Sequence, residues 1–242
     1  MYSRRILITG GASSLGEAIT RSLVRSSDNR VFFTYNRSLE AATRIEHEFP
    51  QAKALHCDFT DPESLHLLLM QIPDLGLDVL INNAWTGLIT KHFHKTEPAA
   101  FQTSFVHNVL PTVQITQQAI LAFRKKKSGK IINVLTSYLI NRPPTGLAEY
   151  VANKAYLASM SKSWCVENAR HNITSCCVSP SLMQTQLTSD VDERVIAEMI
   201  EAHPLKALIT PQEVADTIEF LVRASPHING ANIIMNGGAD VI

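Results

Sequence analysis

Tyr150 and Lys154 are the two residues of this sequence whose types and spacing could perform proton chemistry. They lie four residues apart in a segment that predicts a helix from Tyr150 to about Glu167, so their side chains share one helical face. A nearby ammonium favours a phenolate and can bring a phenol, whose ordinary pKa is about 10, toward neutral pH. The pair therefore predicts a general acid or base that acts on a substrate oxygen. The same spacing also fits a half-buried tyrosine beside a surface lysine.

Short apolar runs rich in branched residues alternate with helical segments along the chain. The predicted strands are Ile6–Thr9, Val31–Tyr35, Lys53–Cys57, Val79–Asn82, Lys130–Leu135, Ile173–Val178 and Asn232–Met235. This alternation predicts an α/β fold: a single doubly wound (Rossmann) domain over residues 1–242, with a seven-stranded parallel sheet and helices on both faces. Ligands of such sheets bind at the carboxyl ends of the strands.

Composition excludes several classes of function. Lysine plus arginine equals aspartate plus glutamate at 22 each, so no field of one sign predicts nucleic acid or an acidic membrane as a partner. No apolar stretch approaches the about 20 residues of a membrane helix. The adjacent Cys176 and Cys177 do not resemble a disulfide framework, which favours a reducing, cytoplasmic setting. His92 and His94 lie near His107 without a cysteine or carboxylate cluster, so we expect no metal site.

A glycine-rich turn follows the first predicted strand and precedes a helical segment. It reads Thr9-Gly10-Gly11-Ala12-Ser13-Ser14-Leu15-Gly16. In such a turn the backbone N–H groups can approach a diphosphate at the positive end of the helix. A tight turn that merely needs glycine torsions is the alternative interpretation.

Taken in order, these residues resemble the short-chain dehydrogenase/reductases of about 250 residues, which use NAD or NADP, and the resemblance runs from end to end. The matching segments are the TGxxxGhG turn at Thr9–Gly16, Cys57-Asp58, Asn82-Asn83-Ala84, the tetrad Asn108, Ser137, Tyr150 and Lys154, the segment Pro180–Thr185, and Asn229-Gly230 with Asn236-Gly237-Gly238. Three positions depart from the family's glycines near the cofactor: Ser14, Trp85 and Ser181. Trp85 could be a stacking wall or core packing.

The resemblance implies a role for each member of the tetrad. Tyr150 would donate a proton to a carbonyl oxygen during reduction, and Lys154 would lower the phenol pKa and hold the nicotinamide ribose. Asn108 would hold a water that links Lys154 to solvent. Ser137 would polarise the substrate carbonyl, because its thirteen-residue step to Tyr150 matches the family. Counting forward from the fifth strand selects Thr136 instead, and this alternative stays open.

The resemblance also implies a set of cofactor contacts. These are Thr9, Gly10, Ser13, Ser14, Leu15, Gly16, Arg37, Asp58, Phe59, Asn83, Ala84, Tyr150, Lys154, Pro180, Met183 and Thr185. Arg37 follows the second strand, where an NAD enzyme would carry a carboxylate, so we expect NADP (NADPH) rather than NAD. Glu40 is the counter-argument, although an acid there also fits the first turn of a helix. Thr185 could equally N-cap a following helix.

We therefore expect an NADP-dependent oxidoreductase that reduces a carbonyl to a secondary alcohol or catalyses the reverse, with a substrate loop at about residues 183–210. A carrier-bound 3-oxoacyl substrate is favoured by resemblance only, and a sugar or polyketide carbonyl or a simple secondary alcohol stays open. The alternative is a non-catalytic sensor or scaffold that binds a nicotinamide nucleotide. Resemblance also implies a homotetramer or homodimer.

Overall fold

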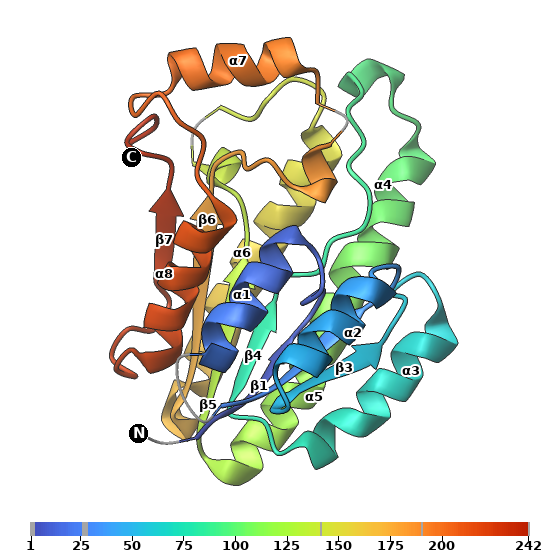
Figure 1. The fold of residues 1–242 in the computed structure, drawn as a ribbon. Coiled ribbons are helices and arrows are strands. Elements are labelled where there is room, and N and C mark those ends of the chain that lie inside the picture. The colour runs from blue at the N-terminus through green and yellow to red at the C-terminus, as the bar shows by residue number, and fades with distance from the viewer. Residues whose placement is uncertain (1–2, 26–28, 141, 190, 242) are drawn as a thin grey trace.

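The computed structural model describes residues 3–25, 29–140, 142–189 and 191–241. Its strands form one parallel seven-stranded sheet in the order β3-β2-β1-β4-β5-β6-β7 (Figure 1). The strands are β1 (Arg5–Ile8), β2 (Arg30–Tyr35), β3 (Ala52–His56), β4 (Val79–Asn82), β5 (Gly129–Val134), β6 (Ile173–Pro180) and β7 (Asn232–Met235). The α/β fold predicted from the sequence is confirmed.

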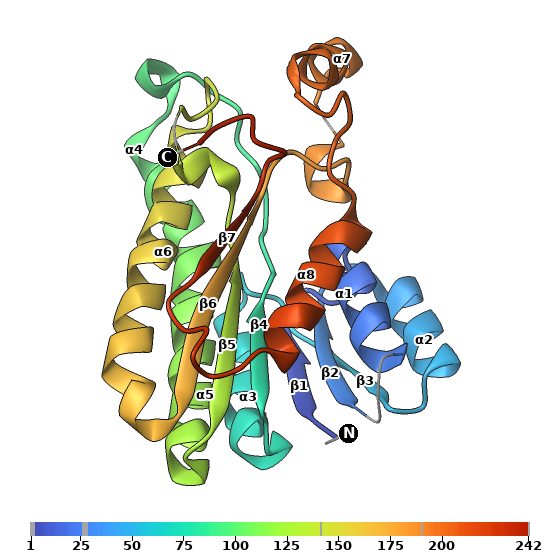
Figure 2. The same cartoon turned by 90° about the vertical axis from the view of Figure 1, so that its left-hand side faces the viewer.

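Helices cover both faces of the sheet. They are α1 (Ser14–Arg25), α2 (Leu39–Glu48), α3 (Pro62–Gln71), α4 (Pro98–Ser104), α5 (Leu110–Lys126), α6 (Ala148–Asn168), α7 (Glu193–Ala202) and α8 (Pro211–Arg223). In Figure 2, α1, α2 and α8 lie on one side of the sheet and α3, α5 and α6 on the other. The strands run upward in both views, so α7 and the loops at the top stand over their carboxyl ends.

Two apolar cores, one on each face, fix the sheet between the helices. Successive residues of a strand point to opposite faces, so Ile6 and Ile8 join the core beneath α1 and α8, whereas Leu7 joins the core beneath α5 and α6. Every residue of β4 and of β6 is buried, as expected for parallel strands covered on both sides. The carboxyl edge is thereby held rigidly enough to position a site.

A row of buried polar side chains crosses the core beneath α5 and α6. Asn82 of β4 donates through Nδ2 to Asn133 Oδ1 of β5 at 2.8 Å and to Thr116 Oγ1 at 3.0 Å. Asn133 Nδ2 donates to Ser161 Oγ at 3.1 Å, and Ser161 Oγ lies 2.8 Å from Ser175 Oγ of β6. In the described part of the chain, only Asn82 Oδ1 is a buried side-chain polar atom without a partner. Hydrogen bonds of side chains thus join β4, β5 and β6 in addition to the backbone ladder.

Candidate active site

Tyr150 and Lys154 lie on the buried face of α6, next to the end of β5. Lys154 Nζ donates to the carbonyl oxygen of Val134, the last residue of β5, at 2.9 Å. The same Nζ lies 5.7 Å from the centre of the Tyr150 ring. The predicted pairing of the two side chains on one helical face is therefore present, and it is anchored at the carboxyl edge of the sheet.

The loop that leaves β5 brings a hydroxyl to the phenol. Burial raises the pKa of Tyr150 well above its ordinary value, and a side-chain hydrogen bond with Thr136 offsets part of this rise. Tyr138 and Glu149 raise the pKa further because they are negative when ionised. Ser137 is buried beside Thr136, but the described contacts of the Tyr150 phenol include Thr136 and not Ser137. Both alternatives for the polarising hydroxyl stay predictions, and Thr136 is the one that interacts with the phenol.

The sequence predicts that Lys154 lowers the pKa of the Tyr150 phenol, but Lys154 is not among the causes of its shift. Lys154 is only 4% exposed, and burial lowers its own pKa to about 7. No ion pair of Lys154 occurs among the residues that the structure describes. With a pKa of about 7, Lys154 is only partly protonated near neutral pH, and desolvation is the largest cause of the Tyr150 pKa shift.

Trp85 contacts both members of the pair. Its ring lies over the Lys154 ammonium, with Nζ 4.2 Å from the ring centre. It also forms a T-shaped pair with the Tyr150 ring, with the ring centres 5.2 Å apart and an interplanar angle of 82°. Trp85 also packs against the core beneath α5 and α6, yet it remains partly exposed. Trp85 thus combines core packing with contacts to Lys154 and Tyr150, and its role as a stacking wall for a ligand stays a prediction.

Asn108 anchors the loop that carries Trp85. It lies in a π-helical turn, Phe105–Val109, between α4 and α5. Its Oδ1 accepts from the Thr86 backbone N–H at 2.6 Å, and its Nδ2 donates to the Thr86 carbonyl oxygen at 3.2 Å. The side-chain amide is thus engaged in both directions with one residue of the loop. The expected link from Asn108 through a water to Lys154 stays a prediction.

A buried polar chain that was not predicted from the sequence links α6 to this turn. Asn153, next to Lys154, donates through Nδ2 to Glu149 Oε1 at 2.8 Å and to Ser104 Oγ at 3.1 Å. Ser104 Oγ also accepts from Asn108 Nδ2 at 3.3 Å. The four-residue spacing of Glu149 and Asn153 is a signal that could have revealed the first link. The contact with Ser104 is long-range, and the sequence carries no local sign of it.

The glycine-rich turn between β1 and α1 has the geometry of a close backbone approach. Gly10 has a φ of +66°, and a Cβ on Gly16 would lie 1.9 Å from the Gly10 carbonyl oxygen. Thr9 Oγ1 accepts from the backbone N–H groups of Asn83 and Ala84, both at 3.0 Å, and so ties the turn to the end of β4. Glycine is required at these positions by packing, and the turn opens at the N-terminus of α1, where an anion is favoured.

Ser14 joins this turn to the loop after β6. Its Oγ accepts from the Gln186 backbone N–H at 3.1 Å. Thr185 and Thr188 form a reciprocal cap on a short 3₁₀ turn, Gln186–Thr188, which matches the local interpretation of Thr185. Met183 packs against the core beneath α1 and α8. The loop therefore lies against the mouth of the turn.

Arg37 and Asp58 lie just beyond the ends of β2 and β3, close enough for the charge of Arg37 to act on Asp58. Hydrogen bonds from the Thr60 backbone and side chain lower the pKa of Asp58, and Asn36 and the positive charge of Arg37 add to this. Arg37 itself is exposed. Phe59 is buried in the core, so only its backbone can face a ligand. An exposed cation and an ionised carboxylate thus flank the same end of the sheet.

The remaining predicted positions have backbone or packing roles. Leu15 is a buried residue of α1, and Pro180 ends β6. Ser13 Oγ donates to the Gly10 carbonyl oxygen at 2.7 Å. Asn83 Nδ2 donates to the carbonyl oxygens of Thr9 and Gly10 at 3.0 and 3.2 Å. These contacts shape the turn.

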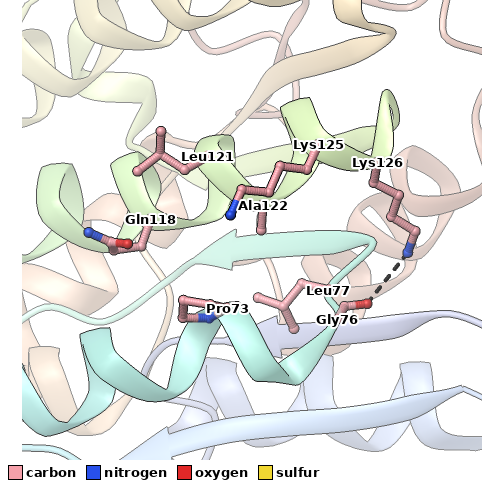
Figure 3. Close-up of a pocket in the computed structure, with 8 residues that line it drawn as sticks. All are labelled: Pro73, Gly76, Leu77, Gln118, Leu121, Ala122, Lys125 and Lys126. Carbon is pink, nitrogen blue, oxygen red and sulfur yellow. Dashed lines mark hydrogen bonds between the residues drawn. The ribbon is translucent and has the colours of Figure 1, made fainter.

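The pocket in Figure 3 lies at the other end of the sheet. It has a volume of about 450 Å³, and its walls come from the segment that precedes β4 and from the last turns of α5. The lining residues are Pro73, Gly76, Leu77, Gln118, Leu121, Ala122, Lys125 and Lys126. None of the predicted site residues contributes to it.

Two further features concern metals and membranes. The rings of His92 and His94 lie 5.8 Å apart, and the described residues contain no group of three or more histidine, cysteine or acidic side chains placed to bind a metal ion. No helix in the described part of the chain combines the length and the apolar character that a membrane crossing requires.

Known proteins share both the sequence pattern and the fold. Residues 10–240 match the family described as Enoyl-(Acyl carrier protein) reductase. The 3-oxoacyl-[acyl-carrier-protein] reductase FabG of Vibrio cholerae is 27% identical over 242 residues, which cover 98% of this chain and 97% of the relative. A solved short chain dehydrogenase/reductase family protein superposes with a TM-score of 0.85 at 26% identity, covering 96% of this chain and 95% of its own. YwfH, an NADPH dependent reductase involved in bacilysin biosynthesis, has a TM-score of 0.89 at 21% identity over the full length of both chains.

Proposed function

The chain belongs to the short-chain dehydrogenase/reductase family and is an oxidoreductase, and from this premise we propose that it reduces a carbonyl to a secondary alcohol, or catalyses the reverse, with NADP(H). The convergence of Tyr150, Lys154 and Thr136 at the end of β5 carries the proposal. Four elements would be needed for such chemistry: a proton donor, a hydroxyl beside it, a cation and a nearby diphosphate turn. All four lie at the carboxyl edge of one sheet.

The residues fit a nicotinamide dinucleotide at its adenosine and diphosphate end. The turn from Thr9 to Gly16 excludes side chains where a Cβ on Gly16 would collide with Gly10. Its N–H groups at the start of α1 would hold the diphosphate. Arg37 would pair with a 2′-phosphate, and Asp58 would face the adenine. When bound, the nicotinamide supplies the hydride.

The protein's own groups would handle the proton. Because burial raises its pKa, the Tyr150 phenol stays protonated at neutral pH and can donate its proton to the carbonyl oxygen. The Thr136 hydroxyl, next to the phenol, would donate a hydrogen bond to the same oxygen and so stabilise its developing negative charge. Lys154 would hold the ribose hydroxyls. Asn108 would keep the loop of Thr86 in place.

Substrate, assembly and setting follow by analogy. We assign residues 183–210, which include α7, to the substrate loop, because α7 stands over the carboxyl ends of the strands (Figure 1). Similarity to FabG favours a 3-oxoacyl substrate. Exposed apolar side chains on α5 and α6, such as Leu121 and Val166, favour a homotetramer or homodimer, which mass photometry would test. The free cysteines agree with a cytoplasmic setting.

The test is the reaction of a Tyr150→Phe variant. NADPH and NADH affinities are measured by fluorescence titration, and turnover is then assayed with a panel of 3-oxoacyl esters and simple ketones. The variant should lose turnover by a factor of about 10² to 10⁴ and keep its NADPH affinity, because only the proton donor is removed. Tyr156→Phe, on an exposed position of the same helix, is the matched control. Equal turnover by Tyr150→Phe and the parent would contradict the proposal.

A non-catalytic nucleotide sensor is the second candidate. The side chains of Ser14, Trp85 and Ser181, at positions near the cofactor where the resemblance implies glycine, favour it. NADPH binding without turnover of any substrate in the panel would support this candidate over the reductase.

A further inference from the structure

Trp85 leaves no room for a ligand oxygen on one side of Lys154. Nζ lies 4.2 Å from the centre of the indole ring, which is van der Waals contact. Another side of the ammonium is taken by the Val134 carbonyl oxygen at 2.9 Å. The whole residue is only 4% exposed. A hydroxyl can therefore reach Nζ only if a covering group moves.

Trp85 is the covering group that is free to move. Val134 is part of the central sheet, and Tyr150 lies one turn away on the same helix as Lys154. Trp85 follows β4 in a loop and remains partly exposed. The backbone beside it is fixed, because Thr86 is bound in both directions by Asn108. Rotation of the indole side chain is thus the simplest way to uncover the ammonium.

We propose that Trp85 is the gate of the cofactor site: its indole covers Lys154 and rotates away when the ribose hydroxyls of a nicotinamide nucleotide bind the ammonium. This inference rests on the proposed function. Trp85 is a positioning residue that acts through Lys154. The cation–π contact holds the gate closed. The apparent affinity of a ligand that needs the open state is the intrinsic affinity multiplied by the fraction of molecules that are open.

The first test compares NADPH affinities of gate variants. Trp85→Gly removes the cover and should bind NADPH about ten times more tightly than the parent, within a range of roughly two- to thirtyfold set by the strength of a cation–π contact. Trp85→Phe keeps a smaller ring and should fall between them. Trp164→Phe, which changes the other tryptophan, buried on α6, is the matched control and should leave the affinity unchanged.

The second test observes the gate directly. In Trp164→Phe, Trp85 is the one remaining tryptophan, because the chain contains 2. Saturation with NADP⁺, which does not absorb where tryptophan emits, should shift the Trp85 emission to longer wavelength and change its quenching by acrylamide. This measurement does not require Trp85→Gly, so it tests the proposal even if that variant fails to fold. In that case Trp85→Ala replaces Trp85→Gly in the affinity series.

The outcomes separate the gate from the proposed function. Equal or weaker NADPH binding by the uncovered variants, or an unchanged Trp85 emission on saturation, would overturn the gate while nucleotide binding by the parent upholds the cofactor assignment. Failure of the parent and of every variant to bind NADPH and NADH would overturn the proposed function, and the gate with it.

Discussion

Replacing the buried lysine by an apolar residue of similar length should stabilise the protein, and more so at neutral than at alkaline pH. Burial lowers the pKa of Lys154 from its ordinary 10.5 to about 7. Between these values the unfolded chain binds a proton that the folded chain does not, so the free energy of unfolding rises with pH in this window. At about 1.36 kcal/mol per pKa unit, Lys154 costs roughly 4 kcal/mol of stability at pH 7 and roughly 2 kcal/mol at pH 9.

The assay is urea unfolding of the parent and of Lys154→Met at both pH values. The variant leaves the Val134 carbonyl without its donor, at a cost of about 1–3 kcal/mol that does not depend on pH. The decisive quantity is therefore the free energy of unfolding of Lys154→Met minus that of the parent. This difference should fall by about 2 kcal/mol between pH 7 and pH 9. The contribution of Cys57, whose pKa burial raises to about 11, falls with rising pH equally in both proteins and cancels in the comparison.

A surface lysine on the same helix provides the control. Lys162→Met replaces an exposed cation, and its difference from the parent should be the same at pH 7 and pH 9. If Lys154→Met behaves like Lys162→Met, then the Lys154 ammonium is hydrated in solution, and the burial on which the reasoning depends is wrong.

Four further substitutions test the site. Arg37→Ala should weaken NADPH binding about tenfold to a hundredfold, because a charge-assisted hydrogen bond is worth about 1.5–3 kcal/mol; an equal loss for NADH in the same titration would refute the assignment to the 2′-phosphate. Thr136→Ala should lower kcat by roughly 10², whereas Ser137→Ala should change it little; the reverse ranking in steady-state kinetics would restore Ser137 as the polarising hydroxyl. Gly16→Ala would bring its Cβ to 1.9 Å from the Gly10 carbonyl oxygen, so it should destabilise the fold by about 1–3 kcal/mol and abolish nucleotide binding; an unchanged melting temperature and NADPH affinity would contradict this.

The order of elements could be predicted because its signals are local. Continuous apolar runs, such as Val79–Asn82, indicate strands covered on both faces, and the structure has the same bounds for β4. The four-residue step from Tyr150 to Lys154 fixes their shared face for any helix. Strand bounds shifted by up to two residues, as at the end of β6, where pairing with β7 extends the strand to Pro180.

The electrostatics of the site could not be predicted in this way. Spacing shows that Lys154 is near Tyr150, but it does not show how deeply the two side chains are buried. Desolvation raises the phenol pKa, whereas the sequence predicted a lowered one. The cover by Trp85 depends on a loop that is 65 or more residues away in sequence from the pair. The choice between Thr136 and Ser137 depends on the path of the loop after β5. Counting forward from the strand selects Thr136, whereas counting back from Tyr150 selects Ser137. Long-range packing decides all three.

The buried polar row beneath α5 and α6 bears on how the chain finds its strand alignment. Apolar strands such as β1, β4 and β5 resemble one another, so hydrophobic burial alone distinguishes poorly between neighbouring alignments. A shift of β5 by one residue against β4 would turn Asn133 to the opposite face and leave the Asn82 amide without that acceptor in an apolar layer. An unsatisfied buried amide costs about 1–3 kcal/mol, and Ser161 would lose its donor as well. These amides and hydroxyls therefore act as alignment markers, which widen the energy gap between the native sheet and its misaligned competitors during folding.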